Sequence, residues 1–367
     1  MDVIDSVAAD PAVDPAADPA VDSARDWRPK RIVITRAALG WEHGRAIAER
    51  ASALGLPVTE LASDRLGLGD TAYADAKSTL AIVVAPPGKL RLQPIAPSAD
   101  WRVDLAEGCP AHCSYCYLAG SLKGPPVTRA YANLPEIFDA LPAYLGQGKV
   151  TSRSAARLHE GTTFEASCYT DPLGIEHLTG SLAATIAHFG SWEANVQLRF
   201  TSKFASVTPL LGIAHEGRTR MRASVNPAGY ARYEGGTARV ADRLRALARM
   251  ADARYPVGLT IAPIIAAAGW RETYGALLAD AGQLLGGVAD LTIELITHRY
   301  TAGSKAVLGS WYPGSKLDMT MTDRTEKRTK FGAVKYVYDK PTMTALRGWF
   351  EAEIARQLPR ARVLYWT

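Results

Sequence analysis

The stretch GCPAHCSYC at residues 108–116 places three of the chain's four cysteines in the spacing C-x3-C-x2-C. Disulfide frameworks of secreted proteins spread their cysteines along the chain, whereas such close spacing favours a metal centre. Thiolates that converge from one short loop suit an iron–sulfur cluster, because soft sulfur donors bind its irons. The sequence therefore predicts that Cys109, Cys113 and Cys116 bind a [4Fe–4S] cluster.

Three protein ligands leave one iron of a four-iron cluster open. That iron can chelate the amino and carboxylate groups of S-adenosylmethionine (SAM), and electron transfer then yields a 5′-deoxyadenosyl radical. The alternative is a structural zinc site with Cys168 or His112 as the fourth ligand. Zinc sites usually combine two cysteine pairs, and this sequence has no second pair. The aromatic residue Tyr115 also fits a radical SAM loop, so we predict a radical SAM enzyme.

Charge is unevenly distributed along the 367 residues. Residues 1–26 hold seven Asp and one Arg, and they repeat an Asp-Pro-Ala pattern without apolar periodicity, which predicts a disordered acidic tail. The whole chain has a formal charge of +5, so the remainder carries +11, which suits a polyanionic partner or an ordinary basic surface. The chain has no membrane-length apolar run and no secretory signal pattern, which predicts a cytoplasmic protein.

Residues 27–98 are predicted to form a small α/β unit. Lys30–Thr35 and Leu80–Pro86 are rich in β-formers, and His43–Gly55 has helical spacing that ends at a glycine. Residues 99–367 then alternate between the two element types. The expected strands are Val196–Lys203, Thr219–Asn226, Val257–Ile265, Leu291–His298 and Arg362–Trp366. The expected helices are Asn133–Gly146, Thr179–Gly190, Thr237–Ala253, Trp270–Leu285 and Thr342–Leu358.

This alternation is typical of a parallel sheet, whose active site lies at the carboxyl ends of its strands. A complete eight-fold barrel shows more repeats, so we expect an α/β fold built on a partial (β/α)6-type radical SAM barrel. Asn133 and Glu136 are spaced as a capping-box variant at the start of the first barrel helix.

The chain resembles the spore photoproduct lyase family, radical SAM enzymes that reverse a thymine-dimer lesion in DNA. The resemblance runs from about residue 30 to the end. It depends on four segments that occur in this order: Gly108–Leu118, Phe164–Asp171, Gly174–Thr179 and Glu294–Tyr300. The cysteine loop alone identifies only the superfamily, whereas the segments together are specific to the family.

The resemblance implies roles for single residues. Cys168 matches the cysteine that gives a hydrogen atom to the thymine radical after bond scission; a lone cysteine is otherwise more often a small buried hydrophobe. Tyr115 and Tyr117 match tyrosines implicated in returning a hydrogen atom towards SAM, and the alternative is that they pack around the cluster. Four residues match positions around SAM, with solvated loop residues as the alternative: Thr170, Asp171, Lys203 and Ser224.

One segment departs from the family. A hairpin near the C-terminus of family members carries an Arg-Tyr pair that wedges into DNA, and the matching stretch 330–336 is shorter and lacks that pair. Base extrusion leaves a space in the stack that a side chain must fill, so Phe331 or Tyr336 fills it or the substrate differs. Lys330 and Lys335 remain available for phosphate contact, or they belong to an ordinary charged hairpin.

These observations predict a lyase that cleaves a thymine-dimer-type DNA lesion through hydrogen abstraction, C–C scission and return of hydrogen from a thiol. Its expected cofactors are a [4Fe–4S] cluster and SAM. Its expected partners are damaged DNA and an electron donor such as flavodoxin or ferredoxin, and we expect a monomer. The alternatives are a family member that acts on a nucleoside or other small molecule, or a non-catalytic, metal-containing DNA-binding module.

Overall fold

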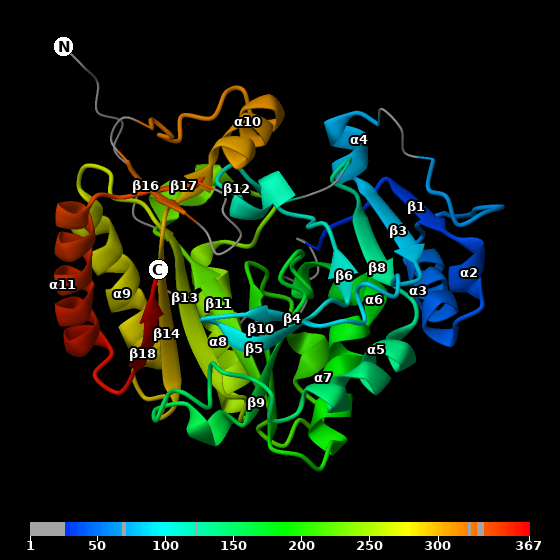
Figure 1. The fold of residues 1–367 in the computed structure, drawn as a ribbon, viewed down its shortest axis with the longest axis horizontal. Coiled ribbons are helices and arrows are strands. Elements are labelled where there is room, and N and C mark those ends of the chain that lie inside the picture. The colour runs from blue at the N-terminus through cyan, green and yellow to red at the C-terminus, as the bar shows by residue number, and fades with distance from the viewer. Residues whose placement is uncertain (1–25, 68–70, 122–123, 322–323, 329–333) are drawn as a thin grey trace.

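The computed structural model describes residues 26–67, 71–121, 124–321, 324–328 and 334–367. The acidic tail predicted for residues 1–26 therefore lies outside the described residues, apart from Asp26. Figure 1 shows a large curved sheet beside a smaller one, with helices packed around both. Within the described part of the chain, no helix has the length and apolar character needed to cross a membrane.

The large sheet has eight strands in the order β18-β14-β13-β11-β10-β9-β5-β4. All neighbours are parallel except the edge pair β4 and β5. The sheet does not close on itself, so it forms the partial barrel that the sequence predicts. Its strands are β4 (Gln93–Ile95), β5 (Ala99–Val103), β9 (Thr162–Ala166), β10 (Val196–Ser202), β11 (Thr219–Val225), β13 (Val257–Ile264), β14 (Leu291–Thr297) and β18 (Arg362–Trp366).

Helices follow most of the parallel strands and cover the outer face of the sheet (Figure 1), whereas only a 3-10 turn, Thr208–Leu210, lies between β10 and β11. They are α5 (Leu134–Ala140), α6 (Glu176–Thr179), α7 (Ser181–Ser191), α8 (Val240–Asp252), α9 (Trp270–Leu285) and α11 (Lys340–Gln357). In α8, the buried residues Leu244, Leu247 and Met250 recur every three residues and form one apolar stripe. The five predicted barrel strands are confirmed, with ends that agree to within one residue. The last three predicted helices are also confirmed, with ends that agree to within three residues.

The first sheet has the order β2-β1-β3-β8-β6. Its strands are β1 (Arg31–Ile34), β2 (Val58–Glu60), β3 (Thr79–Val83), β6 (Ala106–Glu107) and β8 (Thr128–Tyr131), and its helices are α2 (Arg36–Leu39), α3 (Glu42–Ala53) and α4 (Tyr73–Lys77). Thus β6 and β8 lie beyond residue 98, where the predicted N-terminal unit ends. The reason is that β8 pairs in parallel with the buried strand β3, with Leu80 opposite Thr128. The two sheets share the chain between residues 93 and 131.

Two small antiparallel sheets lie near the cysteine loop. One pairs β7 (His112–Cys113) with β12 (Glu234–Gly235). The other has the order β15-β17-β16 and consists of β15 (Tyr300–Thr301), β16 (Thr325–Arg328) and β17 (Val334–Val337). Helix α10 (Ala302–Trp311) follows β15 and packs on the short 3-10 turn after the cysteines.

The predicted capping box at Asn133 is wrong. The fully buried Asn133 side chain accepts a hydrogen bond from the backbone N–H of Ala85 (2.7 Å) and donates to the carboxylate of Glu136 (2.6 Å). Asn133 therefore ties α5 to the segment after β3 and makes no side-chain cap. The predicted helix 133–146 also ends early, because Pro142 lacks the N–H that a continuing helix needs, and a 3-10 turn over Leu141–Tyr144 replaces it.

Candidate active site

A cavity of about 390 Å³ opens at the carboxyl ends of the barrel strands. Strands β9, β10, β11, β13 and β14 all contribute lining residues at or just after these ends, as expected for a parallel α/β sheet. The lining includes all ten residues predicted for the cluster, the cofactor and the chemistry: Cys109, Cys113, Cys116, Tyr115, Tyr117, Cys168, Thr170, Asp171, Lys203 and Ser224. The structure thus brings together residues that are up to 115 positions apart in the chain.

A hollow of about 560 Å³ lies at the opposite, amino end of the barrel strands. Its lining includes His159, Gln197 and Arg220 but none of the residues predicted for the site. The hollow with the larger volume therefore does not contain the predicted site residues, whereas the cavity with the cysteines does.

The cysteine loop, residues 108–116, is held by backbone contacts on both sides. Cys113 pairs with Glu234 in the short ladder between β7 and β12, and the N–H of Ser114 donates to the carbonyl of Tyr233 (2.9 Å). Gly108 begins the loop with φ +80°, and a Cβ there would lie 2.2 Å from the carbonyl oxygen of Val127. Only glycine fits this close approach. Backbone contacts with β12 and Val127 therefore fix the conformation of the loop.

The three loop cysteines are free and only partly exposed. Burial raises the pKa of all three thiols, to about 11 for Cys109. Metal ligation requires thiolates, so the charge of a bound cation has to offset this desolvation. No group of three or more His, Cys, Asp or Glu side chains within the described ranges is arranged to hold a single metal ion. A multi-iron cluster has a different requirement, because each thiolate binds a different iron.

Cys168 reaches the cavity through a strained turn. It follows β9 and Ser167, whose φ of +54° is in the left-handed region that non-glycine residues rarely adopt. The turn is fixed because the Ser167 N–H donates to the carbonyl of Val103 (2.7 Å) and its hydroxyl accepts from the N–H of Leu105 (3.0 Å). Burial and the carboxylate of Glu165 raise the pKa of Cys168 well above its usual value. Cys168 therefore carries its hydrogen at neutral pH.

The two tyrosines of the loop have different surroundings. Tyr115 is 7% exposed, and its hydroxyl donates a hydrogen bond to the carboxylate of Glu234. Burial raises the pKa of Tyr115 well above its usual value. The ring of Tyr117 lies 5.5 Å from the guanidinium of Arg299. Both rings line the cavity, but the hydroxyl of Tyr115 is already bonded to the protein.

The residues predicted to surround SAM are coupled to one another. Asp171 accepts hydrogen bonds from the hydroxyl of Ser202 and the N–H of Lys203, both at 2.7 Å, so its carboxylate is engaged in the protein. The ammonium of Lys203 donates to Ser224 (2.9 Å), Glu234 (2.9 Å) and a backbone carbonyl.

Thr170 differs from these residues. Its hydroxyl oxygen is buried and has no hydrogen-bond partner among the described residues. An unpaired buried hydroxyl is costly, so Thr170 is the member of this group with hydrogen-bonding capacity left for a ligand.

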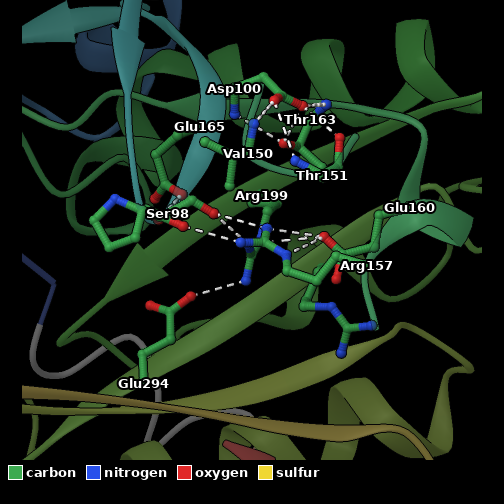
Figure 2. Close-up of polar contacts among 12 residues, drawn as sticks. Ser98, Asp100, Val150, Thr151, Arg157, Glu160, Thr163, Glu165, Arg199 and Glu294 are labelled. Carbon is green, nitrogen blue, oxygen red and sulfur yellow. Dashed lines mark hydrogen bonds and ion pairs between the residues drawn. The ribbon is translucent and has the colours of Figure 1, made fainter. Parts of the chain in front are cut away.

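A buried charge network that the sequence analysis missed forms the floor of the cavity. Glu294 accepts from Arg222 (2.6 Å), Arg199 (2.8 Å) and the hydroxyl of Tyr365 (2.9 Å), and Arg222 also pairs with Glu165. Figure 2 shows Arg199 between Glu294 and Glu160, beside Ser98. The sequence could have pointed to Arg199 and Glu294, because each is a charged residue in the middle of an apolar strand, VQLRFTS and LTIELIT.

The C-terminal hairpin is described only in part. Lys330 and Phe331 lie outside the described residues. Tyr336 is opposite Tyr300 in the ladder between β15 and β17, and the two rings stack with centroids 5.6 Å apart. Lys335 is opposite both Thr301 and Lys327. Tyr336 therefore packs against Tyr300 within its own sheet and is only partly buried, and its role as a wedge stays a prediction.

The family model for spore photoproduct lyase matches residues 27–367. Two spore photoproduct lyases, from Geobacillus sp. (strain Y412MC61) and Bacillus subtilis (strain 168), are 36% and 35% identical to the chain; each match covers 92% of this chain and 98% of the relative. A solved spore photoproduct lyase double mutant with bound AdoMet and dinucleoside spore photoproduct has a TM-score of 0.84 and 34% identity, with 93% of this chain and 100% of that chain covered. Another, complexed with dinucleoside spore photoproduct, has the same TM-score and 35% identity over the same shares.

Proposed function

The chain belongs to the spore photoproduct lyase family and is a radical SAM lyase, and on this premise we propose that its cavity repairs a spore-photoproduct-type thymine lesion with SAM and a [4Fe–4S] cluster. The observation that supports this most is the gathering of all ten predicted site residues around one cavity at the carboxyl ends of the strands. Related structures contain AdoMet and the dinucleoside form of the lesion.

Cys109, Cys113 and Cys116 are the proposed cluster ligands. The thiols are free, and they line one cavity from a loop that the β7–β12 ladder holds in place. When bound together, the cluster and SAM supply the radical that takes a hydrogen atom from the substrate. The protein contributes the fixed loop and a largely buried site.

Thr170, Lys203 and Ser224 are proposed to orient the polar methionine end of SAM. Thr170 offers an unpaired buried hydroxyl, whereas Lys203, which pairs with Glu234 (2.9 Å), holds Ser224 at the cavity wall. A zwitterion in a poorly hydrated site needs such partners. Asp171 is proposed to act indirectly, because its carboxylate already fixes the backbone of Lys203 (2.7 Å).

Cys168 is proposed as the hydrogen donor to the product radical. The step transfers one hydrogen atom: the S–H bond of Cys168 breaks, a C–H bond forms on the thymine, and a thiyl radical remains. A donor of this kind has to be a thiol, and the raised pKa of Cys168 keeps it one. Tyr117 and Tyr115 are the proposed route by which hydrogen returns, with Tyr117 the freer of the two because Glu234 binds the hydroxyl of Tyr115.

We propose DNA as the natural carrier of the lesion and a flavodoxin- or ferredoxin-class protein as the electron donor of a monomeric enzyme. Anaerobic incubation with SAM, dithionite and either the dinucleoside lesion or a duplex that contains it tests the substrate. Repair of both supports DNA repair. Repair of the dinucleoside alone favours a small-molecule substrate, which the packing of Tyr336 within its sheet makes the specific alternative. Absence of both repair and SAM cleavage in iron-loaded protein contradicts the proposed function.

A further inference from the structure

Helix α4 of the first sheet contacts the cysteine loop with two side chains. Tyr73 and Lys77 begin and end this helix. Residues four apart lie on the same face of a helix, so both can reach the same neighbour. Neither residue has a role predicted from the sequence, and neither lines the cavity.

Lys77 binds the backbone of the loop between two proposed cluster ligands. Its side chain is 5% exposed, and its ammonium donates hydrogen bonds to the carbonyls of Cys109 and Ala111. These two bonds fix the orientation of the peptide groups immediately around Pro110. A change at Lys77 therefore acts directly on the loop that presents the thiols.

Among the described residues, no carboxylate pairs with the charge of Lys77. Within the part of the chain that the structure describes, its recorded partners are the two carbonyls, and it makes no ion pair with Asp or Glu. A buried ammonium is strongly unfavourable unless an opposite charge lies nearby. A [4Fe–4S] core bound by three thiolates has a net negative charge and gains another on reduction. A bound cluster would thus supply the counter-charge that no described Asp or Glu provides.

Tyr73 extends the same contact to the outer side of the loop. Its hydroxyl lies 3.3 Å from Nδ1 of His112, and it also hydrogen-bonds the hydroxyl of Tyr312. Its ring lies 5.0 Å from that of Trp311 at the end of α10. Helices α4 and α10 therefore meet at the loop, which gives Lys77 a fixed support.

We infer that Lys77 is a positioning residue for the cluster: it holds the loop carbonyls in place and supplies a positive charge that favours the reduced cluster. This inference rests on the cluster assignment proposed above. A unit positive charge about 10 Å from a redox centre, at an effective dielectric constant of about 20, changes its reduction equilibrium by roughly tenfold. The first sheet would then contribute to electron uptake as well as to the fold.

The experiment compares Lys77→Met, Lys77→Gln and Lys77→Arg with the wild-type full chain and with Lys149→Met, a control at an exposed lysine. Iron and sulfide per chain are measured after anaerobic reconstitution. The reduced fraction is measured by EPR at a series of fixed potentials without SAM. Lys77→Met should lower both iron retention and, by about tenfold, the ratio of reduced to oxidised cluster at a given potential.

The other variants separate charge from hydrogen bonding. Lys77→Gln keeps N–H donors without charge, so its reduction equilibrium should shift like that of Lys77→Met while it retains more iron. Lys77→Arg keeps charge and donors and should restore both quantities towards wild type. If Lys77→Met does not fold by circular dichroism, Lys77→Gln and Lys77→Arg decide the question. A wild-type reduction equilibrium in a folded, neutral variant overturns the inference, whereas failure of the wild type itself to take up iron overturns the cluster assignment.

Discussion

At Cys168, the surroundings of one sulfur atom determine which chemistry it can perform. Burial and the carboxylates of Glu165 and Asp104 raise its pKa, against the opposing effect of Arg102 and Arg222. A thiolate would be a good nucleophile or metal ligand, whereas a protonated thiol can give up a hydrogen atom. Burial raises the pKa of the three loop thiols too, so what separates Cys168 from them is its position after β9, outside the loop, although all four line the same cavity.

Cys168→Ala is expected to keep the iron content and SAM cleavage of the wild type, because the radical forms before the thiol acts. The product radical then lacks its donor, so clean repair should fall by at least about tenfold while trapped by-products increase. Loss of a small side chain at the cavity wall should cost little packing. Product analysis by liquid chromatography and mass spectrometry checks this, and loss of iron in the variant would identify Cys168 as a ligand instead.

Glu294 is expected to stabilise the floor of the cavity in a pH-dependent way. Burial alone would raise its pKa, but Arg222 and Arg199 outweigh this and lower it from 4.5 to about 2. The stabilisation is therefore complete above pH 4.5 and is lost as the pH falls towards 2. Glu294→Gln leaves buried guanidinium groups without their counter-charge, so it should lower the free energy of unfolding by about 3 kcal/mol at pH 7.

Urea unfolding at pH 7 and at pH 3.5 checks the Glu294 prediction. The difference in unfolding free energy between the wild type and Glu294→Gln should shrink at the lower pH. The exposed carboxylate Glu351, whose partner Arg347 lies one helical turn before it, offers the matched control. Glu351→Gln should change stability by less than about 1 kcal/mol at either pH. If the two substitutions changed the free energy of unfolding equally, the buried network would stabilise the protein no more than an exposed ion pair does.

At the scale of elements, the cysteine loop depends on the strands and turns around it. Gly108 provides the one backbone conformation that brings the loop against Val127. The β7–β12 ladder then places Cys113 opposite Glu234, and Glu234 in turn binds Lys203 and the hydroxyl of Tyr115. One short strand thus connects the proposed cluster ligands to the residues proposed around SAM.

Gly108→Ala is expected to disturb this loop, since its Cβ would overlap the carbonyl oxygen of Val127 at 2.2 Å and φ is +80°. We expect a loss of about 1–3 kcal/mol in unfolding free energy and a lower iron content after reconstitution. Gly212→Ala is the control, because its added Cβ would meet no atom within 4 Å. Iron analysis and thermal unfolding of both variants test the idea, and full iron loading in Gly108→Ala would refute it.

The barrel strands could be predicted because strands such as β10 and β13 are buried on both faces and read as apolar runs. The site residues could be placed together because parallel strands end at one edge of their sheet. The capping box at Asn133 was wrong because a distant backbone group, at Ala85, competes for the side chain. The role of Arg222 was not predicted, because it depends on ion pairs with Glu165 and Glu294 from neighbouring strands. A local sequence pattern does not show such pairs.

At the scale of the whole molecule, the two sheets are interleaved along the chain. β4 precedes residue 98 and pairs with barrel strand β5, whereas β6 and β8 follow it and complete the first sheet (Figure 1). The loop that carries the cysteines lies between β6 and β8 in the sequence. Both sheets therefore determine the position of the loop.

Residues 99–367 expressed alone are expected not to fold into a stable barrel. Removal of residues 27–98 would strip β8 of its partner β3 and expose apolar side chains that pack in the same core cluster as Leu80, such as Ala130 and Ala132. Circular dichroism and size-exclusion chromatography should show aggregation or an unfolded chain, while residues 27–367 should behave like the full chain. A monomeric, cooperatively unfolding 99–367 fragment would show that the barrel is an independent domain.

Isotope labelling tests directly whether this cavity repairs the lesion with Cys168 as the hydrogen donor. A thiol exchanges its hydrogen with solvent, so repair of the dinucleoside lesion in D2O should place one deuterium in each repaired product. The measurement is mass spectrometry of the product after a single anaerobic turnover with SAM and dithionite. We expect deuterium in the wild-type product and a loss of clean, deuterated product in Cys168→Ala. Repaired product without deuterium from the wild type would contradict it.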